Sequence, residues 1–270
     1  MPTTSRQLRA AISEEIAAWC RTITAAFRNG PGDARRIHRG RVAIKRLRAA
    51  LRLFRPSADP RLIDAGLATL RRLAHALANA RDLTARADAL AGLSAHADPG
   101  LPPETLASAL AWLVRGGEPS PRNETLRYAR LLPLAGSLEE MVLGLIGDAD
   151  RTGLKKGFRR ARARCERAFE RACAVASPAR AHAWRKRAKD AHYQAQLLQA
   201  VGIRGMAGHA RRYGQIAHTL GTLRDTQLIR QALSAAPQRS IRERLVLVHT
   251  AQRLEDALWR EARTLHRQHA

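Results

Sequence analysis

An internal repeat is the feature that most constrains how this chain can fold. The ten residues LAHALANARD at 73–82 return as IAHTLGTLRD at 216–225, with Ala, His, Leu, Arg and Asp in register. Upstream of each copy, a histidine is followed by basic residues at +3 and +7: His38, Arg41 and Lys45 in the first copy, His182, Arg185 and Lys189 in the second. The leading histidines are 144 residues apart. Such a repeat predicts two equivalent halves, related by a pseudo-twofold axis.

The spacing of the apolar residues predicts an all-α protein. Apolar residues recur every three or four positions along most of the chain, Ala, Leu and Arg dominate, and β-branched runs are short, a combination that favours helices over strands. A long last helix is expected from about Arg242 to Arg267. The apolar positions expected to pack it are Leu245, Val248, Leu254, Leu258 and Leu265. Four side chains are expected to cap helix N-termini: Asp33, Ser57, Ser120 and Ser177.

The net charge of the chain restricts its partners. Among 270 residues there are 48 Lys and Arg against 23 Asp and Glu, which gives a formal net charge of +25. Such self-repulsion destabilises a compact state unless a polyanion or counterions offset it. Nucleic acid, inorganic polyphosphate, an anionic membrane surface and an acidic protein all fit this charge, so only the placement of the basic residues can separate them.

Cysteine usage and the N-terminal segment indicate an intracellular protein. The three cysteines, Cys20, Cys165 and Cys173, are odd in number and lack CxxC spacing, so neither a disulfide framework nor a zinc site is expected. The segment MPTTSRQLRAAISEE has no apolar run typical of a signal peptide, and no stretch approaches the roughly 20 apolar residues that span a bilayer. We therefore expect a soluble cytoplasmic protein that does not enter a membrane.

A single helix explains why basic and apolar residues are mixed so densely in IHRGRVAIKRLRAALRLF, residues 37–54. At about 100° per residue, a basic ridge falls within an arc of roughly 80° and consists of His38, Arg41, Lys45, Arg48 and Arg52. An apolar stripe lies about 120° away and consists of Ile44, Leu47, Leu51 and Phe54. The second copy has a weaker ridge of His182, Arg185, Lys189, His192 and Gln196. The helix can therefore pack on a bundle and still present basic side chains.

Two such ridges are suited to holding successive phosphates. Guanidinium forks, ammonium groups and imidazole N–H donors all bind phosphate oxygens. The alternative is a solvated basic face, which is common on charged helices, but repetition of the histidine at matched offsets favours phosphate binding. The arginines of the two repeated Arg–Asp pairs, Arg81 and Arg224, are added as phosphate ligands. Asp82 and Asp225 either orient these arginines or cap the next helix.

The motifs resemble those of the CHAD family, the conserved-histidine α-helical domains. The resemblance rests on HxxRVxxKRLRAALRLF, ALANARDL, HxxRKxxKxxxY and LGTLRD, and it covers nearly the whole chain. It implies two pseudo-symmetric antiparallel four-helix bundles around a basic central cleft that binds inorganic polyphosphate, with family members found at polyphosphate granules. We expect a single CHAD domain over residues 1–270, with halves at about 5–115 and 122–268. No ExExK motif of the hydrolases often fused to CHAD domains occurs, so a stand-alone CHAD protein is expected.

Carried over by position, the CHAD motif implicates ten residues in polyphosphate binding: His38, Arg41, Lys45, Arg46 and Arg48 in the first half, and His182, Arg185, Lys186, Lys189 and Tyr193 in the second. The ridges add Arg52 and His192. The sequence departs from the family pattern at Asp190 and His192, where basic residues are usual, and at Gly40, where an apolar residue is usual. We therefore expect the first half to contribute more of the affinity.

The sequence offers no candidate catalytic or metal-binding motif. Glu14–Glu15 and Glu139–Glu140 are adjacent pairs rather than carboxylates spaced to share a helix face, and no P-loop, HExxH, GxSxG or carboxylate cluster for Mg²⁺ occurs. We therefore expect a binding protein rather than an enzyme, with no cofactor and no metal. Nucleic acid is the main alternative ligand, although aromatic residues make up only 4% and are not interleaved with the ridges. A protein-interaction scaffold built on the C-terminal helix is the third alternative.

Overall fold

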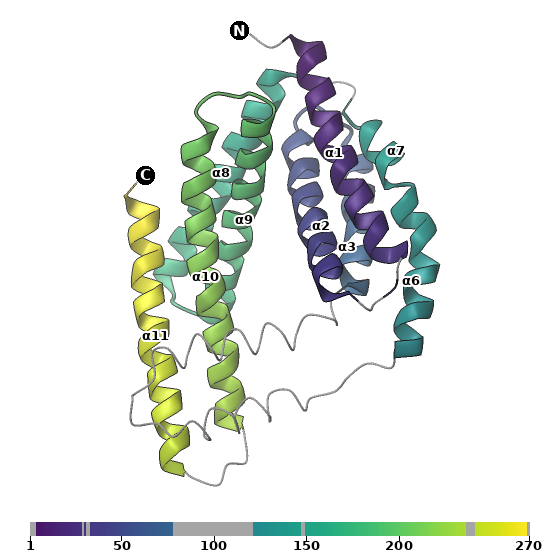
Figure 1. The fold of residues 1–270 in the computed structure, drawn as a ribbon. Helices are drawn as coiled ribbons and strands as arrows, with labels where there is room; N and C mark the ends of the chain where they lie inside the picture. Colours follow the sequence, from purple (N-terminus) through teal and green to yellow (C-terminus); the bar gives the residue numbers. More distant parts are fainter. Residues whose placement is uncertain are drawn as a thin grey trace. The chain divides into compact units, whose positions relative to one another are not determined.

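Helices make up most of the residues that the computed structural model describes, which are residues 4–28, 30, 33–77, 121–146, 149–235 and 241–268 (Figure 1). No strand occurs within these ranges, and the predicted all-α class is confirmed. The helices are α1 (Ser5–Arg28), α2 (Ala34–Phe54), α3 (Pro60–Ala76), α6 (Pro121–Gly136), α7 (Leu138–Leu143), α8 (Arg151–Ala174), α9 (Pro178–Ala200), α10 (Met206–Ala235) and α11 (Ile241–Arg267). The long last helix therefore agrees with the sequence prediction to within one residue.

The chain divides into two compact units. The first contains Met1–Ala80, Pro119–Ala168 and Arg187–Tyr213, and the second contains Arg81–Glu118, Phe169–Lys186 and Gly214–Ala270. Helices α8, α9 and α10 each contribute a part to both units. The predicted halves at about 5–115 and 122–268 stay a prediction, because residues 78–120 lie outside the described ranges.

The first unit is built around α1 and α2. Helix α1 contacts α2, α6 and α7, and α3 contacts both α2 and α6 (Figure 1). Apolar residues at intervals of three or four give α1 one continuous buried face, formed by Leu8, Ile12, Ile16, Trp19, Ile23 and Phe27. The hydroxyl of Thr24 donates to the carbonyl of Ala135 at 2.9 Å. This bond fixes α1 against the C-terminal end of α6.

Side-chain caps start three of these helices. Asp33 accepts a hydrogen bond from the backbone N–H of Arg36 at 3.0 Å, and Ser177 accepts one from that of Arg180 at 3.3 Å, so both predicted caps are confirmed. The predicted cap at Ser57 is wrong: its hydroxyl donates back to the Phe54 carbonyl, and Asp59 caps α3 instead. The helix begins after Asp59 because Pro60 follows it, and proline is favoured in the first turn of a helix. Ser120 lies outside the described residues.

Two glycines allow α2 to approach its neighbours closely. A Cβ atom added at Gly40 would lie 2.6 Å from the Cβ of Ala26 in α1. A Cβ atom added at Gly157, in α8, would overlap the backbone carbonyl oxygen of Leu53 in α2. The departure from the family pattern at Gly40 therefore has a packing reason, because a larger side chain would push α1 and α2 apart.

The second unit contains a cluster of aromatic rings around Trp184, which is fully buried. The ring of His266 stacks on Phe169 with 3.9 Å between centroids and meets Trp184 edge-on at 5.4 Å.

The prediction that Leu245 packs helix α11 is wrong, since this side chain is 48% exposed. The buried positions of α11 include Leu247, Ala251, Glu255, Ala262 and His266. Their spacing of four or seven follows one helical face that Leu245 does not share.

Candidate anion-binding site

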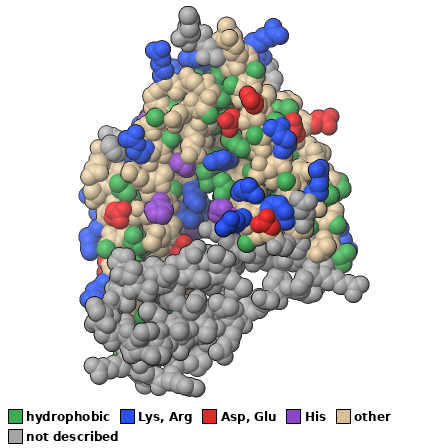
Figure 2. All heavy atoms as spheres, viewed as in Figure 1, with side chains coloured by type: hydrophobic (Ala, Val, Ile, Leu, Met, Phe, Trp, Pro, Cys, Tyr) green, Lys and Arg blue, Asp and Glu red, His purple; other side chains and the backbone are tan. Residues whose placement is uncertain are grey.

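The basic ridge of α2 lies beside the core of the first unit. The apolar stripe of this helix is confirmed, because Ile44, Leu47, Leu51 and Phe54 are all buried. Within the ridge, His38 is exposed, whereas four side chains are half-buried: Arg41, Lys45, Arg48 and Arg52. Lys and Arg are also spread over the face of the molecule shown in Figure 2, where Asp and Glu are fewer. Half-burial means that the ridge meets other helices as well as solvent.

Arg41 has a structural partner that the sequence did not indicate. Its Nη1 donates to the backbone carbonyl of Leu77 at 2.7 Å, at the C-terminal end of α3. The last carbonyls of a helix lack intrahelical donors, and a cation there also faces the negative end of the helix dipole. Arg41 therefore stabilises the end of α3 besides being a candidate ligand.

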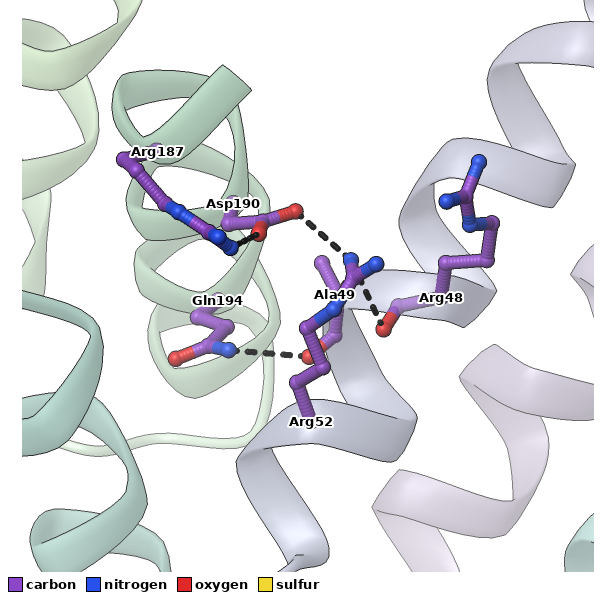
Figure 3. Close-up of polar contacts among 6 residues, drawn as sticks. All are labelled: Arg48, Ala49, Arg52, Arg187, Asp190 and Gln194. Carbon is purple, nitrogen blue, oxygen red and sulfur yellow. Dashed lines mark hydrogen bonds and ion pairs between the residues drawn. The ribbon is translucent and has the colours of Figure 1, made fainter. Parts of the chain in front are cut away.

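Arg52 pairs with a carboxylate from α9. Its Nη1 lies 2.9 Å from Oδ1 of Asp190 and 3.5 Å from the carbonyl of Arg48. The other carboxylate oxygen of Asp190 lies 3.7 Å from Nη1 of Arg187 (Figure 3). One turn further along α9, the buried amide of Gln194 donates to the Ala49 carbonyl at 2.9 Å. These bonds hold α9 against α2 at the ridge.

Arg52 and Arg187 contact Asp190, and Arg164 and Arg48 interact with it electrostatically. We refer to these five residues together as the arginine cluster. They come from α2, α8 and α9, so only the fold brings them together. Burial raises the pKa of the Asp190 carboxyl, but Arg52 and the other three guanidinium groups oppose this, and we assign the carboxylate as ionised at neutral pH. Four positive charges then share one negative charge, which leaves the cluster strongly positive.

Two arginines of the cluster have buried N–H donors for which no described residue provides a hydrogen-bond acceptor. Burial, followed by repulsion from neighbouring arginines, lowers the pKa of Arg48 and of Arg164. Nε of Arg48 and Nη2 of Arg164 are both buried without a hydrogen-bond partner in the described parts of the chain. Leaving such donors unpaired costs roughly 1–3 kcal/mol each, and more for charged groups. The cluster is therefore complementary to an anion with several acceptor oxygens.

A second group of cations lies in the second unit, and we call it the His182 cluster: His182, Arg185, Lys186 and Arg224. Burial and then the three neighbouring cations lower the pKa of His182. The guanidinium of Arg185 lies over Gly221, where an added Cβ would be 3.3 Å from its Nε and Nη2 atoms. The structure thus brings together the first two residues of the second ridge, His182 and Arg185, and the arginine of the repeated Arg–Asp pair, Arg224.

The structure excludes one of the two roles considered for the acidic partner in that pair. Helix α10 continues without interruption through Arg224 and Asp225 to Ala235, so Asp225 does not cap the next helix. The equivalent pair in the first copy, Arg81 and Asp82, lies outside the described residues.

The remaining predicted ligands lie around α9 in the first unit. Nδ1 of His192 donates to the backbone carbonyl of Ala210 at 2.8 Å, which fixes α9 to α10, and burial lowers the pKa of this histidine. Arg46 and Tyr193 line a cavity of about 380 Å³ together with Trp19 of α1. Lys45 and Lys189 are half-buried.

Sequence reasoning missed Arg164, Arg187 and Gln194 as parts of this site. Arg164 belongs to a run of arginines in α8 that the sequence does not distinguish from one another, yet it is half-buried. The available signal was Asp190 itself, since it is the single acidic residue of α9, while α2 has none. A lone carboxylate in a strongly basic helix indicates where cations from other helices converge.

Two properties of the described residues bear on function. They contain no group of three or more His, Cys, Asp and Glu side chains arranged to hold a metal ion. None of their helices combines the length and the apolar character that crossing a membrane requires.

Comparison with known proteins decides the family. Residues 10–234 match the CHAD domain, which is most of the chain. The chain belongs to the CHAD domain family. This CHAD protein also resembles the solved structure of PptA from Streptomyces chartreusis, with a TM-score of 0.64 and 17% sequence identity over 96% of this chain and 98% of that one. At this identity the likeness concerns the fold. No curated protein matches the sequence.

Proposed function

We propose that this CHAD protein binds inorganic polyphosphate, without catalysis, through the arginine cluster and the His182 cluster. The observation that carries the proposal is the excess of guanidinium groups around one carboxylate, with buried donors on Arg48 and Arg164 that have no acceptor among the described residues. The CHAD resemblance extends the proposal to the paired four-helix bundles with a basic central cleft and to a location at cytoplasmic polyphosphate granules.

A chain of phosphates suits these clusters for reasons of geometry and charge. Each guanidinium is a planar fork of N–H donors that can bind two oxygens of one phosphate. Polyphosphate offers acceptor oxygens at every unit and no bulky groups between them, so neighbouring arginines such as Arg48 and Arg52 can bind successive units. Half-burial strengthens each contact, because the lower local dielectric weakens electrostatic interactions less than water does.

The placement of the aromatic side chains favours polyphosphate over single-stranded nucleic acid. Among the described Phe, Tyr and Trp residues, all are buried except Tyr193 and Trp259, and these two are only partly exposed. Proteins that bind single strands without sequence preference stack the bases on accessible aromatic rings. The described surface offers little of this, whereas its cations serve a phosphate chain directly.

The proposal excludes catalysis because of how the carboxylate in the cluster is held. Both oxygens of Asp190 face guanidinium groups, Arg52 at 2.9 Å and Arg187 at 3.7 Å. A general base needs an oxygen that is free to approach the proton of a substrate or water, and both oxygens of Asp190 are already directed at guanidinium groups. Asp190 is therefore better suited to organising arginines than to activating water.

Competition binding tests the proposed function. Labelled long-chain polyphosphate is displaced by unlabelled polyphosphate, single-stranded DNA or duplex DNA, matched in phosphate concentration at near-physiological salt. Wild-type protein should prefer polyphosphate, and Arg48→Ala/Arg164→Ala should lose about tenfold or more in affinity, since each charged hydrogen bond contributes about 1.5–3 kcal/mol. The charge-matched control Arg61→Ala/Arg72→Ala removes two exposed arginines of α3 and should lose far less.

Two outcomes would contradict this assignment. Equal displacement by DNA would show a general polyanion surface in place of a polyphosphate site. Equal losses in the two double variants would show that net charge, and not the arginine cluster, determines affinity.

A further inference from the structure

The carboxylate of Asp190 pairs with two arginines of the cluster that a bound phosphate would also use. It faces Arg52 and Arg187 at 2.9 Å and 3.7 Å, and its side chain is only 15% exposed (Figure 3). Coulombic interactions also link it to Arg48 and Arg164. An anion that enters the cluster must therefore share these guanidinium groups with a charge of its own sign.

The surrounding bonds keep Asp190 in this position. Gln194, one turn later in α9, is buried and bonded to the Ala49 carbonyl of α2, so this part of α9 cannot easily swing away from the ridge. Arg52 is held from the other side by the carbonyl of Arg48. The carboxylate is thus a fixed part of the site, in contrast to a surface side chain that solvent would turn aside.

We propose that Asp190 is an internal counter-anion that competes with phosphate for the arginine cluster and so sets the affinity of the site. This inference rests on the proposed polyphosphate function and adds to it a residue that opposes binding. A nearby charge of like sign disfavours an anion by an amount comparable to the 1–3 pKa units that one neighbouring charge produces. Removing the charge should therefore raise the affinity for polyphosphate about tenfold or more.

Asp190→Asn is the direct test, because asparagine has nearly the same shape and its side-chain oxygen can still accept from Arg52. Affinity for polyphosphate should rise about tenfold, with the larger gain at low salt. The slope of log affinity against log salt concentration should become steeper, by an amount that corresponds to roughly one additional phosphate contact. Asp190→Glu keeps the charge and should leave the affinity near that of wild type.

The chain offers a matched control in Asp64. Its carboxylate also lies 2.9 Å from an arginine, Arg55, but this pair is exposed, at 56% and 42% of the two side chains. Asp64→Asn makes the same change in net charge and breaks an ion pair of the same length outside the cluster. Its affinity should change less than about twofold, since exposed ion pairs contribute little.

A second pair of variants keeps the test decisive if four unbalanced arginines prevent Asp190→Asn from folding. Arg187→Gln should weaken binding because it removes one cation of the cluster. The double variant Arg187→Gln/Asp190→Asn has the original net charge of the cluster. It should bind about tenfold more tightly than Arg187→Gln alone. Far-UV circular dichroism on each protein establishes that it is folded.

The outcomes separate this inference from the proposed function. If wild type and Asp190→Asn bind equally, or if Asp190→Asn binds more weakly, Asp190 does not compete with phosphate, although the polyphosphate function stands. If only Asp190→Asn binds, the counter-anion role stands and the function proposed for the wild type is wrong. If neither protein binds, both proposals are wrong.

Discussion

Gly157 should be one of the most sensitive positions of the first unit. A Cβ atom at this position would overlap the carbonyl oxygen of Leu53 and lie 3.0 Å from its carbonyl carbon. The obstacle is backbone of a fully buried residue, so it cannot rotate aside and α8 must move away from α2. Such overpacking costs about 1–3 kcal/mol, whereas alanine stabilises a helix by about 0.5–1 kcal/mol relative to glycine. Gly157→Ala should therefore lower the free energy of unfolding by about 1–2 kcal/mol.

Gly208 provides the control for this prediction. It is an exposed glycine of α10, and an added Cβ would meet nothing within 4 Å. Gly208→Ala should leave stability unchanged or raise it by up to about 1 kcal/mol. Urea unfolding followed by circular dichroism measures both variants against wild type. A Gly157→Ala variant as stable as the Gly208→Ala variant would refute the close approach of α8 to α2, and with it the position of Arg164 in the arginine cluster.

Two further predictions concern titratable groups. Burial lowers the pKa of His182, His192 and His209, so the unfolded chain binds protons first and the free energy of unfolding should fall as the pH drops through about 6.5. A Tm that stays constant between about pH 7.5 and 5.5, where carboxyl groups scarcely titrate, would contradict this. Burial also raises the pKa of Cys20 to about 12. A thiol reagent at about pH 8 should label the half-buried Cys173 long before Cys20, and mass spectrometry of the labelled peptides would show comparable rates if this is wrong.

The local features of this fold could be predicted because they depend on neighbouring residues in the sequence. The apolar stripe of α2 follows from helical periodicity, and Asp33 and Ser177 cap helices where polar residues precede apolar runs. The prediction at Ser57 failed for an equally local reason, since a better cap followed by proline stands two residues later at Asp59. The prediction that Leu245 is buried failed because the packing partners of α11 determine which of its faces is buried. Several apolar positions of this helix were compatible with helical spacing.

The arginine cluster could not be predicted because tertiary packing selects its members. Gly157 lets α8 approach α2, and two turns later in α8 the same approach brings Arg164 near the ridge. The sequence alone gave Arg164 no distinction from the other arginines of that helix. The sequence showed Asp190 only as a departure from the family pattern in the second half, and it did not indicate that its carboxylate lies against Arg52 of the first copy.

The contact between α2 and α9 explains why the two copies of the repeat differ at this position. With an offset of 144 residues, Asp190 is the counterpart of Arg46, so the repeated helices themselves meet where Asp190 faces Arg52. A basic residue at 190, as in the first copy, would place like charges together at a half-buried contact, which is destabilising. An acidic residue converts this repulsion into an ion pair and allows α2 and α9 to pack against each other at this point. The same substitution that lets the basic helices pack is therefore expected to limit how tightly their arginines hold phosphate.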